Sequence, residues 1–436
     1  MKIKSVPILA ILYSLIYLSP PCILYGEETK GFKTIKNLSL KDLEALALNQ
    51  SDEIRLSHER NKKIDLEKER FFGSLLPKID MSMGLSSAKL QSSDSLNKSA
   101  DIQIKAIVPN PIKIQNTQRN IENMEEFATA DVKLQEIQVI TKIRKNFLKI
   151  LHLRHKISVT DDNLELLGRI KKENEKRFSS GFINKMDFKK SQMQYQTTRT
   201  EREILSLRLR AEKKTLSHLI HDQAEISLLG SLKYEDQKGL LQWKIKELEE
   251  LVAKNENRDI KIKKVELKSK DVAIAAAKNK YFPEVSLGAS FPVYREDEKK
   301  SSYHAGLSWN LFNGGLTSAE VREKSLDKSL LEMSLQYEDE QLKIQLQQSV
   351  TALHILKESI SLQHESVKNW ESIIKTSQLR FEGGHISYRE LNEDISSFIK
   401  QKVLELDQIF QMLDLLVDFT AKTGYPEEFY RYFKVS

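Results

Sequence analysis

Two glycine-containing corners of this sequence are each followed by carboxylates. The stretch RFSSGFINKMD covers residues 177–187, and RFEGGHISYRELNED covers residues 380–394. Asp187 follows the first corner, and Glu390 and Glu393 follow the second. Because Glu390 and Glu393 are spaced i and i+3, a helix places both on one face, where they could attract cations together. The alternative is that they are ordinary exposed acids on a highly charged helix.

Histidine pairs are the other candidates for chemistry. His152 and His155, and likewise His218 and His221, are spaced i and i+3 and could bind a metal ion on a helix. No carboxylate or cysteine motif accompanies them, so we expect solvated helix positions and no metal. The sequence contains no phosphate loop, dinucleotide fingerprint or nucleophile motif, and we expect neither a cofactor nor an enzyme.

The corners interrupt two very long segments of helical pattern. Apolar residues recur at three- and four-residue steps over residues 112–178 and 316–381. A helix of roughly 65 residues is about 100 Å long, which predicts coiled-coil packing rather than a compact globule. Gly181 and Gly384 can take the positive φ at which helices end. We therefore expect each corner to be the far end of a helical hairpin, with helix resuming after it.

The composition agrees with long helices. The chain has 436 residues but only 15 Gly and 9 Pro, and 30% of its residues are charged. The formal net charge is +7, with positive and negative side chains interleaved along the helical segments. This interleaving indicates a solvated surface rather than a nucleic-acid-binding patch.

The N-terminus has the pattern of a signal peptide. Lys2 and Lys4 precede an apolar run over residues 6–18, which is too short to span a bilayer as a helix. Cleavage after Gly26 is expected. Cys22 lies inside this leader, and a lipidated cysteine is the alternative, although Pro21 at the bond to be cleaved argues against it.

The sequence also contains an internal repeat. A shift of 203 residues places Arg177 on Arg380, and a shift of 206 places Pro77 on Pro283. Matches at several sites, in order and at a nearly constant offset, indicate duplication.

The repeat divides the chain into three parts. We expect a signal peptide at 1–26, a first structural repeat at 27–235 and a second at 236–436. Each repeat would contain a helix, at 40–74 or 246–280, then two strands, the long helix and a returning helix.

Four short segments alternate apolar and polar residues. Their apolar positions are Ile79, Met81, Met83 and Leu85; Ile102, Ile104, Ala106 and Val108; Val285, Leu287, Ala289 and Phe291; and Tyr303, Ala305, Leu307, Trp309 and Leu311. Strands of about ten residues with this alternation are typical of transmembrane β-strands. A half-buried soluble sheet is the alternative, but the secretion signal and the small polar residues between favour the membrane. We expect Leu287, Phe291, Leu307 and Trp309 to face lipid.

Four strands cannot close a barrel, and an open edge in a membrane leaves backbone groups without partners. Closure must therefore come from several chains. Three copies would supply twelve strands, enough to leave a lumen, whereas the interior of an eight-stranded barrel is filled by side chains.

The chain resembles the TolC-like outer membrane efflux proteins from LSLKDLEALALNQSDEI to FTAKTGYP. The resemblance is carried by the LxxLExLALxxS opening, FPEVSLGASF, the strand-to-helix turn LSWNLFNGGLTSAEV and the paired RFxxGxI corners. It implies a homotrimeric channel-tunnel in the outer membrane, with a twelve-stranded β-barrel on a periplasmic α-helical barrel. It also implies a passive conduit for efflux or type I secretion that works with a periplasmic adaptor and an inner-membrane transporter.

The resemblance implies roles for the corner residues as well. In this family the periplasmic tip closes, and rings of carboxylates line the aperture. Glu390 and Glu393, with Asp394 adjacent, occupy the matching positions. Three copies would place six of these carboxylates around the mouth, where they would attract cations.

Asp187 matches a position that helps to hold the aperture shut through a polar link to the inner hairpin. The arginine partner in that link is Ile386 here, so the link is not carried over, and Arg389 nearby could substitute for it. The resemblance assigns adaptor docking to the helical corners, namely Arg177, Phe178, Gly181, Arg380, Phe381 and Gly384.

Two questions stay open at the level of sequence. A non-transporting coiled-coil protein of the cell envelope is the rival class, although such a scaffold has no need of four alternating strands. The cargo, whether drug, metal or protein, and the identity of the transporter are not encoded in the tunnel wall.

Overall fold

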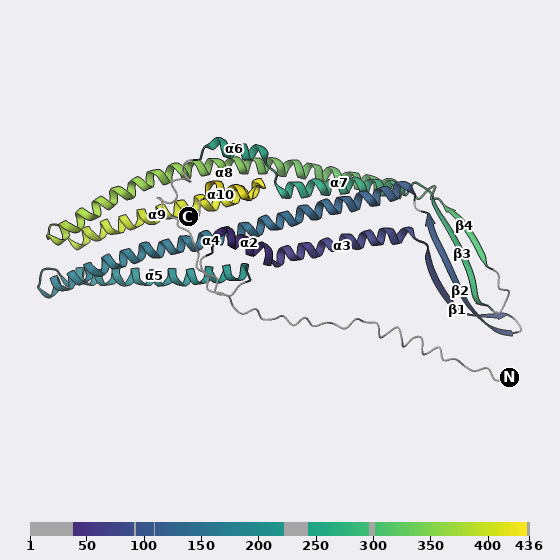
Figure 1. Cartoon of the computed structure of the whole chain (residues 1–436), viewed down its shortest axis with the longest axis horizontal. Helices are drawn as coiled ribbons and strands as arrows, with labels where there is room; N and C mark the ends of the chain where they lie inside the picture. The colour runs from purple at the N-terminus through teal and green to yellow at the C-terminus, as the bar shows by residue number, and fades with distance from the viewer. Residues whose placement is uncertain (1–37, 91–92, 109, 222–242, 296–300, 434–436) are drawn as a thin grey trace, which may run out of the picture.

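The structure is a computed structural model that describes residues 38–90, 93–108, 110–221, 243–295 and 301–433. The expected signal peptide, with Cys22, lies outside the described residues. Figure 1 shows an elongated molecule with the four strands at one end and the tips of two helical hairpins at the other. Long helices connect the two ends.

The helices follow a similar order in the two halves of the chain. In chain order they are α2 Leu40–Gln50, α3 Asp52–Leu75, α4 Pro111–Ser179, α5 Lys185–Leu219, α6 Ile245–Lys254, α7 Arg258–Asn279, α8 Leu316–Glu382, α9 Tyr388–Thr423, the 3-10 turn η2 Pro426–Glu428 and α10 Phe429–Tyr432. Helices α4 and α8 run from the strands to the tips, and α5 and α9 return along them (Figure 1). The two long helices are confirmed; the division into two repeats stays a prediction.

The long helices begin at residues that can satisfy their first backbone groups. Asn110 accepts a hydrogen bond from the backbone N–H of Ile112 at 2.8 Å, and Pro111 occupies the first turn, where a missing N–H costs nothing. Helix α8 instead follows Gly314 and Gly315, whose φ values of 65° and 84° turn the chain out of the last strand.

The helices expected at 40–74 and 246–280 are each broken in two, which corrects the sequence prediction. Ser51 has an extended backbone between α2 and α3, and its hydroxyl accepts from the N–H of Ile54 at 3.5 Å. Asn257 does the same for α7, accepting from the N–H of Ile260 at 3.1 Å. A capping side chain at each site restarts the helix, so an unbroken apolar pattern continues across a break in the backbone.

Both hairpin corners have the backbone that the glycines predicted. Gly181 has a φ of 78° and Gly384 a φ of 76°. At each corner, N–H groups just past the helix bond back to carbonyl oxygens of its last turn. The N–H of Phe182 donates to the oxygen of Arg177 at 2.8 Å, and the N–H of His385 donates to the oxygen of Arg380 at 2.8 Å. This is the Schellman arrangement, which ends a helix without orphaned carbonyls.

The strands form one antiparallel sheet in the order β1-β2-β3-β4. Their bounds are β1 Lys78–Leu90, β2 Ser93–Val108, β3 Glu284–Arg295 and β4 Ser302–Ser308. Ile79 lies opposite Ile104, Ile104 opposite Ala289, and Ala289 opposite Tyr303. Because residues directly opposite each other share a face, the expected apolar positions within the strands gather on one side of the sheet.

Strand β4 is shorter than expected. It ends at Ser308, so Trp309 and Leu311, which were assigned to the strand, lie beyond it. The indole N–H of Trp309 donates to the backbone oxygen of Tyr281 at 3.1 Å. This side chain therefore anchors the end of β4 to the connection between α7 and β3.

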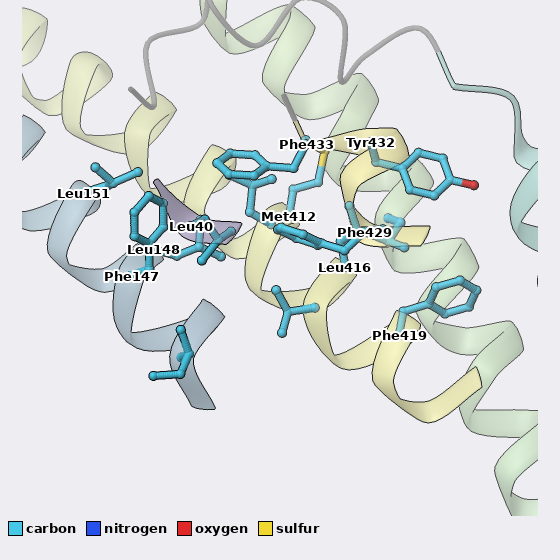
Figure 2. Packing of buried hydrophobic residues seen from close by; sticks show 14 of the residues in the cluster. Leu40, Phe147, Leu148, Leu151, Met412, Leu416, Phe419, Phe429, Tyr432 and Phe433 are labelled. Atoms are coloured by element: carbon cyan, nitrogen blue, oxygen red, sulfur yellow. The ribbon is translucent and has the colours of Figure 1, made fainter. Parts of the chain in front are cut away.

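The main core lies at the middle of the molecule rather than at either end. Figure 2 shows Leu40 of α2, Phe147 and Leu151 of α4, and Met412 of α9 gathered with Phe429 near the C-terminus. These elements are far apart in sequence, so this core holds the two halves of the chain together.

A buried ion pair lies beside this core. Arg144 of α4 is almost fully buried and binds both carboxylate oxygens of Glu44, at 2.6 and 3.3 Å. Its guanidinium also donates to the backbone oxygen of Pro426 and lies 4.7 Å from the ring of Phe429. Arg144 thereby joins α2, α4 and the C-terminal segment.

Candidate functional site

The tips of the two hairpins carry the acids and corner residues singled out in the sequence. In the first corner, Asn184 caps α5, accepting from the N–H of Asp187 at 2.8 Å while its amide donates to the Asp187 carboxylate at 2.9 Å. Phe178 stacks on Phe188 with ring centroids 5.0 Å apart and keeps 37% of its surface exposed. Phe182, just past the glycine, is 83% exposed.

The second corner is packed much more tightly. Phe381 is only 4% exposed and lies in a cluster with Ile374, Tyr388 and Leu391 of its own hairpin and Ile170 of α4. Burial raises the pKa of the Tyr388 hydroxyl to about 12. The end of α4 therefore packs on the second hairpin.

Glu390 caps the helix that carries it. Its carboxylate accepts from the backbone N–H of Ser387 at 3.2 Å, and the Ser387 hydroxyl accepts from the N–H of Glu390 at 3.3 Å. This reciprocal pair is a capping box, and Asp187 holds the same third position in α5. A local structural role therefore accounts for an acid at both positions.

The neighbouring acids differ from one another in their partners. Glu393 is exposed and binds Arg389 one turn earlier at 2.9 Å. Asp394 accepts from the hydroxyl of Ser377 on α8 at 2.6 Å, which joins the two helices of the hairpin. Ile386 packs against the apolar cluster of the second corner. Glu390 and Glu393 thus remain at the exposed surface of the tip, whereas Asp394 is half-buried.

Arg177 reaches from the first corner to the second, and sequence reasoning missed this contact. Its guanidinium donates to the backbone oxygens of Phe381 and Glu382, at 3.1 and 3.2 Å. Its repeat counterpart Arg380 is exposed. No local signal could reveal the contact, because its partners lie about two hundred residues away along the chain.

On the sheet, no described element forms a covering layer over the apolar face. Leu287 and Leu307 are exposed, and Phe291 is half-buried with its ring edge toward Tyr303 at 6.0 Å. Trp309 is exposed one residue past β4. A water-soluble sheet of this kind would bury such a face against a second layer.

The sequence analysis did not identify two further exposed apolar surfaces, although it had assigned Trp309 and Leu311 of the first to a strand. The first, called the junction belt, gathers where strands meet helices and comprises Phe72, Leu76, Tyr281, Phe282, Trp309, Leu311 and Phe312. The second, called the α8 stripe, follows one side of α8 and comprises Leu326, Leu330, Met333, Tyr337, Ile344, Ile355 and Leu362. The available signals were aromatic residues clustered at strand ends and, along α8, spacings of three, four, seven and eleven residues.

Within the described residues, the histidine pairs belong to no group of three or more side chains that could hold a metal ion. His152 is not solvated, contrary to expectation. It contacts Asp407 of α9 at 2.6 Å and stacks on Phe410 at 4.4 Å, and burial lowers its pKa. His221 lies 3.5 Å from Asp52.

Among the helices that the structure describes, none has the length and apolar character to cross a bilayer.

Comparisons with known proteins find one family model and several solved structures that are similar to this chain. Residues 252–403 match the family model of outer membrane efflux proteins. The outer membrane channel CmeC of Campylobacter jejuni has 15% identity and a TM-score of 0.73, over 89% of this chain and 86% of that chain. The outer membrane protein VceC of Vibrio cholerae has 13% identity and a TM-score of 0.73, over 89% and 96%.

The open-state MtrE outer membrane channel of Neisseria gonorrhoeae has 12% identity and a TM-score of 0.71, over 89% of each chain. No curated protein matches the sequence. The structural likenesses confirm the expected fold class of long helices with a small antiparallel sheet.

Proposed function

Because residues 252–403 match the family model of outer membrane efflux proteins and the chain has the fold of such channels, we propose that this protein is the outer-membrane channel-tunnel of a tripartite efflux or type I secretion system. It is a passive conduit from the periplasm to the exterior. Its four strands lie in the outer membrane, its helices extend into the periplasm, and its gate is at the hairpin tips.

One observation carries this proposal. The sheet gathers its apolar residues on one face, and that face is exposed along β3 and β4, with Leu287 46% and Leu307 66% exposed. The opposite face carries serine, glycine and charged residues. Exposed apolar and polar faces on one sheet fit lipid on one side and an aqueous lumen on the other.

The edges of the sheet support assembly from several copies. Among the described strands, β1 and β4 each pair with a single neighbour. In a membrane these edges need partners, and joining β4 of one copy to β1 of the next supplies them. Three copies give twelve strands and a lumen. The α8 stripe, whose spacing is that of a coiled-coil seam, offers a matching helical contact between copies.

The junction belt supports the placement of the bilayer. Its aromatic and aliphatic side chains lie where strands give way to charged helices, at the level where an interface between lipid and water would lie. Aromatic residues are favoured at such interfaces because their rings are amphipathic. Trp309, expected to contact lipid from within a strand, belongs to this belt.

Partners and cargo follow from the proposed role. A periplasmic adaptor would contact the hairpin corners, and an inner-membrane transporter would supply the energy. The cargo would be selected by that transporter.

A coiled-coil structural protein of the cell envelope is the second candidate, and the long helices favour it. It leaves the exposed apolar face of the sheet without a role. Conductance separates the two functions, because only a channel produces discrete current steps when the purified protein is added to a planar lipid bilayer.

A charge on each face of β3 tests the placement of the sheet. Leu287→Arg should sharply reduce the yield of crosslinkable trimer, because a charge facing the bilayer core costs about 2–4 kcal/mol per copy. Ser290→Arg, on the opposite face, is the matched control and should assemble normally. Equal yields from the two variants, or a monomer as the main wild-type species, would contradict the proposal.

A further inference from the structure

We propose that Arg177 holds the periplasmic mouth closed by fastening the first hairpin to the end of α8. This inference rests on the proposed function, because it gives a residue-level device to the gate at the hairpin tips. The contacts of Arg177 with Phe381 and Glu382 are called the hairpin latch below. Arg177 acts in it as a positioning residue, since it acts on the mouth by holding the end of α8 in place.

In the latch, the guanidinium group of Arg177 makes both hydrogen bonds and a contact with an aromatic ring. One terminal nitrogen donates to the backbone oxygens of Phe381 and Glu382, at 3.1 and 3.2 Å. The ring of Phe381 lies under the guanidinium plane, with its centroid 4.5 Å from the central carbon. Nε donates to Glu173 one turn earlier on α4 at 3.1 Å, which orients the group. The Arg177 side chain is only 20% exposed.

The acceptors lie at a place that favours a cation. Phe381 and Glu382 lie in the last turn of α8, where the helix dipole is negative. The Phe381 oxygen also accepts from the backbone N–H of Gly384 at 3.0 Å, and a carbonyl oxygen can accept a second hydrogen bond. Arginine suits this place because its planar group can stack on a ring and donate several hydrogen bonds at once. Since the acceptors are backbone atoms, no side-chain change in the second hairpin removes them.

The latch joins parts that an opening motion would separate. Arg177 lies at the tip end of α4, in the first hairpin, and its acceptors lie at the tip end of α8, in the second. The apolar cluster beside it joins the same two bodies, through Ile170 on one side and Phe381 on the other. Moving the second hairpin away from α4 therefore breaks the hydrogen bonds and the ring contact together.

No other arginine of the two corners makes such a connection among the described residues. Arg389, which the sequence suggested as a substitute, binds Glu393 in its own helix. Ile386, at the position of the family's arginine, has no donor to offer and packs in the cluster. Arg380 holds the same place in the second corner as Arg177 in the first, yet it is exposed. The control is Arg199 of α5, an exposed arginine of the first hairpin that pairs with Glu203 of its own helix at 3.4 Å.

The experiment measures the open probability of full-length protein in planar lipid bilayers. Arg177→Ala should raise the ratio of open to closed channels about tenfold, the change that 1.4 kcal/mol makes in an equilibrium constant. Arg177→Lys keeps the charge but loses the planar fork, so it should fall between wild type and Arg177→Ala. Glu173→Gln should shift the ratio in the same direction by a smaller factor, and Arg199→Ala should leave it unchanged.

Trimer yield and thermal midpoint are measured on the same samples to separate gating from folding. A raised open probability in Arg177→Ala, together with a thermal midpoint equal to that of Arg199→Ala, supports the latch. If wild type conducts and Arg177→Ala opens no more often than wild type, the latch is wrong while the channel stands. If Arg177→Ala loses the trimer, the open probability of the partly conservative variants Arg177→Lys and Glu173→Gln tests the latch instead. Wild-type gating in both variants overturns it. Absence of wild-type current contradicts the proposed function itself.

Discussion

The two hairpin corners share a motif and a backbone but not an environment. Both read Arg-Phe, two residues, then Gly with a φ near 77°. In the first corner Phe178 stays near the surface and Arg177 turns away toward the other hairpin. In the second, Phe381 is buried and Arg380 is exposed. A short motif thus determines the turn, whereas the neighbouring helices determine what its side chains do.

The largest expected difference between the corners concerns their phenylalanines. Phe381→Ala should lower the free energy of unfolding by about 3–5 kcal/mol, because it leaves a cavity in the buried cluster. Phe178→Ala should cost about 1–2 kcal/mol, since a half-exposed ring loses little beyond its stacking on Phe188. Denaturant unfolding in detergent measures both. Equal losses would mean that assembly buries the first corner as deeply as the second.

The next difference concerns charge at the mouth. We expect Glu390→Gln/Glu393→Gln to abolish cation preference and block by trivalent cations in planar bilayers, because the trimer would lose six negative charges from its mouth. Glutamine is the appropriate replacement because it retains the capping box at Ser387. Glu201→Gln, on the exposed surface of α5 away from the tip, is the control. Unchanged selectivity in the double variant would leave these acids with capping and surface roles only.

How much the sequence predicts depends on how local the cause is. The long helices, the glycine corners and the alternating strands were predicted because each is determined by residues close together in the chain. The capping role of Glu390 was also readable, from the Ser-x-x-Glu spacing that begins at Ser387. The breaks at Ser51 and Asn257 were missed because the apolar pattern continues across them.

The parts of the site that escaped prediction depend on contacts between distant segments. Nothing near Arg177 in the sequence distinguishes it from Arg380, and only the packing of α4 on the second hairpin gives it partners. The pairing of His152 with Asp407 is of the same kind. Residue type and spacing therefore identified the corners, but they could not assign roles within them.

A third comparison concerns the ends of the returning helices. Gly424 has a φ of 83°, and a Cβ there would lie 2.4 Å from the backbone oxygen of Glu256. His221, at the corresponding place in the first half, has a φ of 50° and carries its side chain outward. Gly424→Ala should therefore destabilise the protein by about 2 kcal/mol or more.

His221→Gly should change stability by less than about 1 kcal/mol, because relief of the positive φ is offset by greater freedom of the unfolded chain and by loss of the exposed contact with Asp52. Thermal midpoints of the two variants measure the difference. A tolerated alanine at 424 would mean that the junction between α6 and α7 shifts easily.

The smallest expected difference returns to the corner glycines. Gly181 and Gly384 have nearly equal φ values, and a Cβ at either would meet no atom within 4 Å. The cost of alanine is then only that of a left-handed backbone, about 1 kcal/mol at each site. Gly181→Ala and Gly384→Ala should lower the free energy of unfolding equally, to within about 0.5 kcal/mol. Asparagine, which tolerates this conformation better, should recover part of the loss at both sites. A larger loss at Gly384 would show that the buried cluster constrains the turn itself, and a larger loss at Gly181 would show that assembly brings another surface against the first corner.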